Sequence, residues 1–274
     1  MPSAKTYNPL EAGVLLAIVG APGFGKSTFV RSSLPYGKLF VVATLPREIV
    51  TYAGTDTEYE LVDETEGWAP ALGKYDATAY VRLMKILYAL RTRKDIRTVA
   101  LDPMSRAVLF AANVTMAGHG VNDWSQIEEK ARYTFWQSVK AKTLELCDAL
   151  EGLRASGKNV MATFHLDVRE QEGMGQPQEK IEGGLKKLHW DQGFTPDVIG
   201  SVRDTIAGRF DFFSFAERDI SADGSATYWL RVAPSQRAWA KSAIPIFDGK
   251  QRVPLEFKSL HDAMTSYLSK RTTP

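Results

Sequence analysis

The chain has 274 residues, of which 44% are hydrophobic, 24% are charged and 11% are aromatic. This balance is typical of a globular protein and excludes a disordered chain, a collagen-like fibre and a disulfide scaffold. The 34 basic and 32 acidic residues leave a net charge of +2, so any basic surface for nucleic acid would have to be local.

The first part of the chain alternates short apolar runs with segments of helical spacing. Each run is continuous, which is typical of strands buried on both faces of a parallel sheet. Residues 80–87 carry one apolar helical stripe, whereas Pro46 breaks the pattern. We predict buried strands over 14–19, 39–43 and 98–101, a short strand over 59–62, and helices over 28–33, 76–91, 105–116 and 124–153.

The second part of the chain changes character after a fourth buried strand over 160–164. The stretch 168–196 contains glycines, glutamines and many charges with little periodicity, and segments of this length are often functional. A turn at Asp223 and Gly224 joins two later strands. We predict a short helix within 196–206, strands over 210–216 and 226–232, and a last amphipathic helix containing Phe257, Leu260, Met264, Tyr267 and Leu268.

Strands that alternate with helices predict an α/β fold. We expect a mostly parallel sheet with helices on both faces and antiparallel strands added at one edge. The sequence shows no firm domain boundary. We therefore expect one domain over 1–245 and a C-terminal helical extension of the same domain over 246–274.

The cysteine content and the N-terminal segment favour a cytoplasmic protein. The single cysteine, Cys147, cannot form an internal disulfide, which fits a reducing compartment. Residues 1–13 lack the basic and apolar regions of a signal peptide. The longest apolar run, 14–19, is far shorter than the about 20 residues that cross a bilayer.

The segment 20–27 reads GAPGFGKS and matches the phosphate-binding P-loop pattern G-x-x-x-x-G-K-[ST]. Glycines let the backbone curl so that successive N–H groups face phosphate oxygens, and the next helix adds its unpaired N–H groups and dipole. A plain glycine-rich turn is the alternative, but the flanking strand and helix are the context that a P-loop requires. The predicted nucleotide-binding residues are Gly20, Ala21, Pro22, Gly23, Phe24, Gly25, Lys26, Ser27 and Thr28, with Lys26 on the β- and γ-phosphates.

A P-loop site normally has an acid at the end of a neighbouring strand, where it holds the hydrated Mg²⁺. Asp102 follows the apolar run at 98–101 and is our candidate, with the Ser27 hydroxyl as the other metal ligand. Asp102 can also cap the next helix, with Pro103 in its first turn. The two roles are compatible.

Two further candidates follow predicted strands, where residues of an α/β sheet face the ligand. His165 can hydrogen-bond the γ-phosphate or the attacking water, and the alternative is a satisfied polar residue at a strand end. Glu48 is the first choice for the base that positions this water, and the alternative is a solvated surface acid. The other acids considered for the base are Asp63, Glu64 and Glu66.

The motifs GAPGFGKST at 20–28, TVALDPMS at 98–105 and NVMATFH at 159–165 occur in this order. Together they resemble phage nucleotide-binding proteins of the RecA-like P-loop group, which includes single-strand annealing and recombination proteins. The resemblance implies a RecA-like P-loop ATPase domain, ATP with Mg²⁺, and a role in phage DNA recombination, repair or replication in the host cytoplasm. By position, it assigns phosphate binding to 20–28, the second acidic motif to Asp102 and a polar sensor to His165.

Two positions depart from the pattern of that family. Family members often have an acidic cluster after the second strand, whereas 42–46 here reads VATLP, which leaves the hydrolytic base in question. Many also have Ala-Lys-x-Arg near the C-terminal strands; here Ala240 and Lys241 are kept and the arginine is missing. Lys241 is a candidate intersubunit finger for a neighbour's γ-phosphate, or else a solvated lysine.

The resemblance also implies contacts with single-stranded DNA through loops at 117–125 and 169–195. Cations track phosphates and aromatic rings stack on bases, but acids bring the second loop near zero net charge, so a solvated loop is the alternative. The implied partners are single-stranded DNA, further copies of the chain in a ring or filament, and a phage or host single-strand binding protein. The candidate DNA contacts are Arg169, Lys180, Lys186, Lys187 and Trp190.

The leading hypothesis is therefore an ATP-dependent DNA-binding protein. The lack of an acid directly after the second strand favours an alternative, a nucleotide-controlled binding or assembly module with little hydrolysis. A small-molecule kinase is a third hypothesis, but such kinases usually have an arginine-rich lid, and Arg31, Arg47 and Arg169 form no evident cluster.

Overall fold

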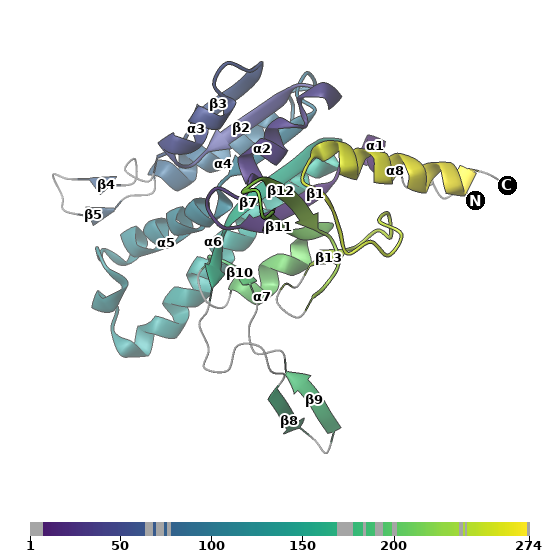
Figure 1. Ribbon diagram of the computed structural model, residues 1–274. Helices are drawn as coiled ribbons and strands as arrows, with labels where there is room; N and C mark the ends of the chain where they lie inside the picture. Colours follow the sequence, from purple (N-terminus) through teal and green to yellow (C-terminus); the bar gives the residue numbers. More distant parts are fainter. Residues whose placement is uncertain are drawn as a thin grey trace, which may run out of the picture.

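A sheet of 10 strands forms the centre of the computed structural model (Figure 1). Along its main path the strand order is β14-β12-β11-β1-β7-β6-β2-β3, and β10 and β13 pair with β7 and β11. The structure describes residues 8–63, 68–69, 74–75, 78–168, 178–182, 185–189, 194–198, 202–235, 238 and 240–272.

Six neighbouring strands of this sheet run parallel, and their register aligns their C-terminal ends. Gly20 of β1 lies opposite His165 of β7, and Ala43 of β2 lies opposite Asp102 of β6. Residues that are far apart in the sequence therefore meet at one edge of the sheet. The parallel strands are β1 (Leu15–Gly20), β2 (Leu39–Ala43), β3 (Thr57–Leu61), β6 (Thr98–Asp102), β7 (Asn159–Val168) and β11 (Phe212–Ile220).

Antiparallel strands extend the sheet beyond β11. β12 pairs with β11 through the predicted hairpin, and β14 pairs with β12. Because β14 lies within 246–274, that segment contributes an edge strand of the main sheet as well as a helix. The antiparallel strands are β10 (Phe194–Pro196), β12 (Ala226–Arg231), β13 (Lys241–Ser242) and β14 (Arg252–Pro254); two separate pairs are β4 (Trp68–Ala69) with β5 (Lys74–Tyr75) and β8 (Gln178–Glu182) with β9 (Leu185–His189).

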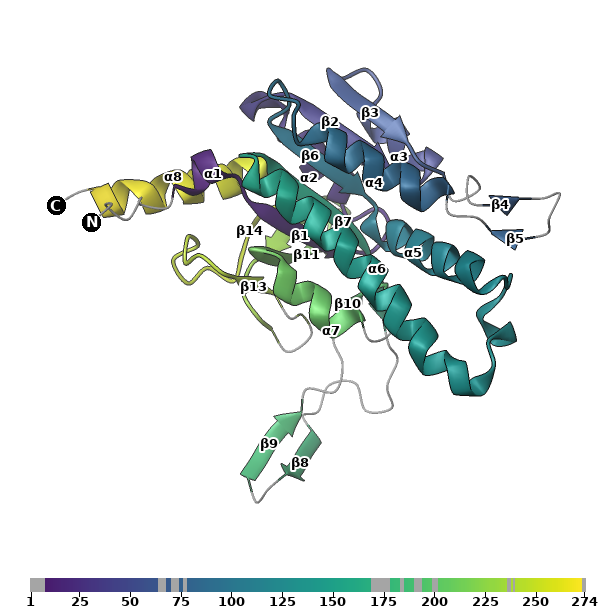
Figure 2. The same ribbon diagram turned by 180° about the vertical axis from the view of Figure 1, so that it is seen from behind.

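Helices cover both faces of the sheet (Figures 1 and 2). In β1, Leu15, Ala17 and Val19 pack with α4, α5 and α6, whereas Leu16 and Ile18 pack with α2, α3 and α8. This alternation is the two-residue period of a strand that is buried on both faces. The helices are α1 (Pro9–Ala12), α2 (Lys26–Arg31), α3 (Pro46–Tyr52), α4 (Thr78–Leu90), α5 (Met104–His119), α6 (Glu129–Ala155), α7 (Arg203–Ile206) and α8 (Phe257–Thr272).

The predicted α/β class, with a mostly parallel sheet and antiparallel strands at one edge, is confirmed. The interpretation of Pro46 as a break was wrong, because Pro46 is the first residue of α3. Proline suits the first turn of a helix, where its missing N–H would have no helical partner. A 3₁₀ turn over Trp124–Gln126 precedes α6, so the helix predicted to start at 124 begins later.

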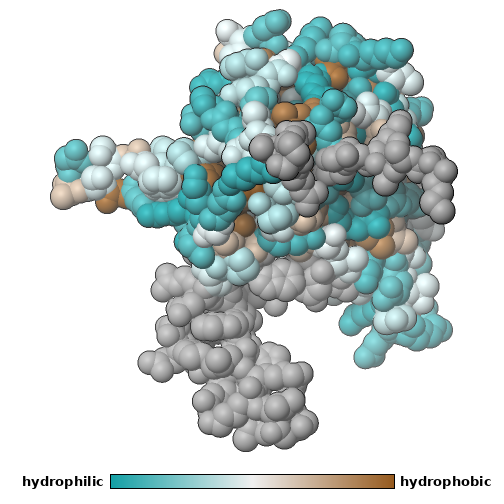
Figure 3. All heavy atoms as spheres, turned by 90° about the vertical axis from the view of Figure 1, so that its right-hand side faces the viewer, coloured by the Kyte–Doolittle hydropathy of each residue, from teal (hydrophilic) through white to brown (hydrophobic). Residues whose placement is uncertain are grey.

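The face of the molecule drawn in Figure 3 is mainly polar, with hydrophobic residues scattered among hydrophilic ones. Scattered apolar side chains of this kind are normal on a protein surface. None of the helices in the described part of the chain combines the length and the hydropathy needed to cross a bilayer.

Candidate functional site

The segment after β1 curls into a tight loop that ends at the first turn of α2. Gly25 precedes the helix with φ of +81°, a backbone conformation that side chains other than glycine rarely adopt. A Cβ atom on Gly25 would also lie 2.9 Å from Cδ2 of Leu255. The glycine is therefore required both by the turn and by the close approach of the C-terminal strands.

Lys26 begins α2 and folds its side chain back over this loop. Its Nζ atom donates to the carbonyl oxygens of Gly20 at 2.7 Å and Ala21 at 3.0 Å. The side chain is buried, and this burial lowers the pKa of Lys26, although Asp102 and Glu48 act in the opposite direction. The ammonium group is thus held over the loop, where it can bind an anion together with the backbone amides.

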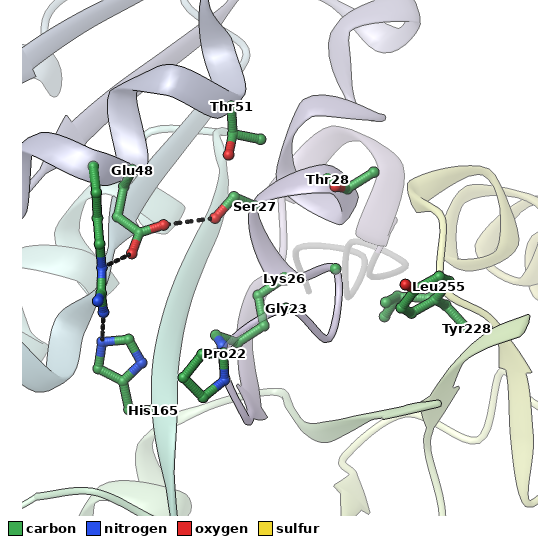
Figure 4. Close-up of a pocket in the computed structure, with 12 residues that line it drawn as sticks. Pro22, Gly23, Lys26, Ser27, Thr28, Glu48, Thr51, His165, Tyr228 and Leu255 are labelled. Atoms are coloured by element: carbon green, nitrogen blue, oxygen red, sulfur yellow. Dashed lines mark hydrogen bonds and ion pairs between the residues drawn. The ribbon is translucent and has the colours of Figure 1, made fainter. Parts of the chain in front are cut away.

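A cavity of about 510 Å³ opens beside this loop (Figure 4). Polar groups from the loop, from α3 and from β7 line it, and an aromatic and an aliphatic side chain lie beyond the loop on the opposite side. Such a volume is typical of sites for small molecules. The lining residues are Pro22, Gly23, Gly25, Lys26, Ser27, Thr28, Arg47, Glu48, Thr51, His165, Tyr228 and Leu255.

One face of the short helix α3 supplies much of the polar lining. Arg47, Glu48 and Thr51 line the cavity, and Tyr52 points inward to β6. Positions three and four residues apart lie on the same side of a helix, so Thr51 lies beside both Arg47 and Glu48. Arg31 of α2 donates to the Thr51 carbonyl oxygen at 3.2 Å and holds the two helices together.

Glu48 joins the loop to α3. Its Oε2 atom accepts a hydrogen bond from the Ser27 hydroxyl at 3.2 Å, and its Oε1 atom lies 3.2 Å from Nε of Arg47. The side chain of Glu48 is 18% exposed, compared with 64% for Arg47. A carboxylate is therefore held beside the hydroxyl predicted to bind metal, even though no acid directly follows β2.

Asp102 lies behind the cavity rather than on its surface. Its side chain is buried, with Oδ2 accepting from the Tyr52 hydroxyl at 2.6 Å and Oδ1 accepting from the Thr163 hydroxyl. Burial and the nearby Asp102 carboxylate raise the pKa of Tyr52 well above its ordinary value, so the phenol stays protonated and can donate. Asp102 is absent from the cavity lining, and Tyr52 reaches it from α3.

His165 lies on β7, opposite Gly20 of β1. Nε2 lies 3.5 Å from a guanidinium nitrogen of Arg47, and the backbone N–H donates to the Ser105 hydroxyl at 3.0 Å. Burial, Lys26 and Arg47 all lower the pKa of His165. A guanidinium group only donates, so this contact is a hydrogen bond in the tautomer that carries its proton on Nδ1. Nδ1 is buried and has no hydrogen-bond partner among the described residues.

The oxygen ligands at this site are suited to Mg²⁺. The Ser27 hydroxyl and the Glu48 carboxylate face each other, and Asp102 lies behind them. Mg²⁺ prefers hard oxygen ligands and is usually held by one or two carboxylates together with water and substrate phosphates. No cluster of three or more histidine, cysteine or acidic side chains able to hold a metal occurs in the described ranges.

The remaining predicted residues lie apart from the cavity or outside the described residues. Lys241, on β13, donates to the carbonyl oxygen of Gly208 at 3.2 Å and does not line the cavity. Lys180 lies opposite Lys187 in the β8–β9 pair, and Lys186 lies opposite Ile181. The candidate DNA contacts Arg169 and Trp190 lie outside the described residues.

Sequence reasoning missed several residues of the site. Arg47, Thr51 and Tyr52 follow from recognising α3, whose only local signal is a proline at its first position. Tyr228 and Leu255 come from the antiparallel edge, and nothing in their local sequence connects them to the P-loop. Only the fold brings four of these side chains to the cavity and places Tyr52 against Asp102 behind it.

The model of a protein family described as "AAA domain" matches residues 12–252 of the chain. The match contains the loop at 20–28, the helix α3, Asp102 and His165. It ends in β14, so it also contains the antiparallel strands β12 and β13. No curated protein matches the sequence.

Proposed function

The chain belongs to the AAA domain family, and from this premise we propose that it is a magnesium-dependent ATPase that acts on single-stranded DNA. The observation that carries the ATPase proposal is the meeting of three groups in one cavity. Lys26 lies over the P-loop, and the Ser27 hydroxyl bonds the carboxylate of Glu48. These are a phosphate-binding cation, a metal ligand and a base, which are the parts that NTP hydrolysis needs.

The orientation of the nucleotide follows from the two sides of the loop. The amides of the loop and Lys26 are suited to phosphates, because they present N–H donors and a positive charge. Tyr228 and Leu255 lie beyond Gly25 and offer an aromatic ring and an aliphatic side chain to the nucleobase of a nucleotide. This division supports a nucleoside triphosphate rather than free phosphate as the ligand.

Hydrolysis requires a base for the attacking water, and Glu48 is suited to that role. Its carboxylate accepts a proton as the water oxygen bonds to the γ-phosphorus and the bond to the β–γ bridging oxygen breaks, giving ADP and phosphate. Mg²⁺, held by Ser27 and the Asp102 side of the site, would neutralise charge on the β- and γ-phosphates. The position of Glu48 against Ser27 favours hydrolysis over a purely structural use of the nucleotide.

The proposed action on single-stranded DNA is supported by aromatic side chains around the junction of α5 and α6, which extends beyond the sheet (Figure 2). Trp124 is 50% exposed and Tyr133 is 74% exposed, and the ring centroids of Trp124 and Trp136 lie 6.2 Å apart. Exposed aromatic rings bind single strands by stacking on bases, whatever the sequence. Phage origin, recombination and assembly into rings or filaments are parts of the same proposal that rest on the resemblance alone.

ATP turnover in the presence of Mg²⁺, with and without single-stranded DNA, tests this proposal. We expect turnover that DNA stimulates, and we expect Glu48→Gln to lower the rate by about 100-fold or more while Mg·ATP still binds. Glu60→Gln, which removes a partly exposed acid of β3 outside the cavity, is the matched control. Tight binding with negligible turnover in the wild type would instead identify a nucleotide-controlled assembly module.

A contribution of the aromatic side chains is tested separately. We expect Trp124→Ala and Tyr133→Ala to weaken DNA binding and to reduce the stimulated rate. Binding that is strong in low salt but equal in the wild type and both variants would show that DNA contacts lie elsewhere. Turnover that does not respond to single strands at any salt concentration would contradict the proposed DNA function.

A further inference from the structure

Among the described residues that line the cavity, Arg47 is the one cation that the P-loop pattern does not explain. It comes from the first turn of α3, and its side chain is 64% exposed. Its two described polar contacts are Nε with Glu48 at 3.2 Å and a terminal nitrogen with His165 at 3.5 Å. Figure 4 shows Glu48 and His165 on the same side of Lys26, and the dashed lines between them mark the two contacts of Arg47.

The contacts of Arg47 are weak for an arginine whose purpose is structural. Its Nε contact is a single hydrogen bond to Glu48 rather than the two-pronged pair that arginine forms with a carboxylate. The contact with His165 is long and pairs the guanidinium with a neutral ring. An exposed ion pair of this kind contributes little to stability, so Arg47 can change partners at low cost.

Positive charge is concentrated at this end of the cavity. The charge of Arg47 lowers the pKa of both Lys26 and His165, which means that the three groups sense one another across the cavity. Lys26 and Arg47 repel each other across the cavity, and an anion bound between them offsets this repulsion. The opposing acid is Glu48, together with the buried Asp102 behind it. A further anion is therefore favoured next to Lys26.

We propose that Arg47 contacts the γ-phosphate of ATP from within the same chain. In this role it supplies the cation that many P-loop enzymes obtain from a neighbouring subunit. Transfer of the guanidinium from Glu48 to the phosphate also frees the Glu48 carboxylate to take a proton from water. The inference rests on the proposed function, and it means that the charge needed for hydrolysis does not depend on Lys241 or on assembly.

The experiment compares the affinities of ATP and ADP in the presence of Mg²⁺ for the wild type, Arg47→Ala and Arg47→Lys. A non-hydrolysable ATP analogue and ADP are titrated by calorimetry. We expect Arg47→Ala to weaken analogue binding by about tenfold or more, because a charge-assisted hydrogen bond is lost, and to change ADP binding less than threefold. Arg47→Lys keeps a positive charge and is expected to recover part of the loss.

The matched control is Arg82→Ala, which also removes an exposed arginine that contacts a glutamate, at 3.1 Å, but outside the cavity. It is expected to leave both affinities unchanged. Equal weakening of the analogue and ADP by Arg47→Ala, or a loss of turnover with no change in either affinity, would overturn the inference, since Arg47 would then act only on folding or on Glu48. A wild type that binds neither nucleotide would instead contradict the proposed function itself.

Discussion

The two ends of the cavity are built from different parts of the sheet and differ in chemistry. At one end, Arg47 and Glu48 of α3 and His165 of the parallel strand β7 carry charge or hydrogen-bonding groups. At the other end, Tyr228 and Leu255 belong to the antiparallel edge and present mainly carbon atoms. The phosphates of a nucleotide need the charged end, and its nucleobase can pack against the apolar end. The two ends of the cavity therefore have separate roles.

The P-loop lies between these ends and contacts both. Gly25 packs against Leu255, and the guanidinium of Arg218 on β11 lies 5.1 Å from the ring centroid of Phe24. On the other side, Ser27 contacts Glu48. A substitution in the loop should therefore affect every ligand, whereas one at either end should affect only part of a ligand.

The largest effect is expected for Lys26→Ala. Loss of the ammonium group removes the main charge from the phosphate site, and we expect affinity for ATP, ADP and inorganic tripolyphosphate to fall by about 3 kcal/mol, or more than 100-fold. Equilibrium binding in Mg²⁺ measures this. Lys142→Ala, which removes an exposed lysine paired with Glu145, is the control. Unchanged binding of tripolyphosphate would show that the phosphates bind elsewhere.

The next effect is expected for Tyr52→Phe, which removes the phenol that donates to Asp102. A buried carboxylate oxygen then lacks its partner, so we expect the free energy of unfolding to fall by about 1–3 kcal/mol and the Mg²⁺-dependent turnover to fall as well. Chemical denaturation and turnover measure the two effects. Tyr80→Phe removes a second phenol, which donates to the Lys142 carbonyl oxygen at 2.8 Å outside the cavity, and should lower stability alone. Equal turnover in both variants would argue against a positioning role for Tyr52.

The sequence predicted those parts of the site that are local in the chain. The P-loop is a continuous motif, and Asp102 and His165 each follow an apolar run, so their common edge could be inferred from the parallel order of the strands. The helix α3 could not be inferred in this way, because a proline after a strand fits a turn as well as a helix start. Tyr228 and Leu255 depend on how the antiparallel edge folds back onto the loop, which is long-range information.

A smaller effect is expected at the apolar end for Tyr228→Ala. Loss of one aromatic contact should weaken ATP and ADP alike by about 1 kcal/mol, or about fivefold, because both carry the same base. Tripolyphosphate has no base, so its affinity should not change. Tyr88→Ala, on the outer face of α4, removes a tyrosine that is 50% exposed and does not line the cavity. If Tyr228→Ala weakens tripolyphosphate as strongly as ATP, the two ends do not have separate roles.

The smallest effect is expected from the titration of His165. Because burial and two neighbouring cations lower its pKa in the folded protein, the unfolded chain, with a histidine pKa of about 6.5, binds the proton first on acidification. Stability therefore falls as the pH drops below this value, until the folded protein also binds the proton.

We expect His165→Gln, which keeps a hydrogen-bond acceptor for Arg47, to remove this part of the decline between pH 8 and pH 5. Urea denaturation at several pH values measures the effect, and His261→Gln, outside the cavity, is the matched control. A decline that is equally steep in His165→Gln and the wild type would mean that the imidazole is not held neutral by Lys26 and Arg47. The charged end of the cavity would then lack the electrostatic coupling on which the role of Arg47 depends.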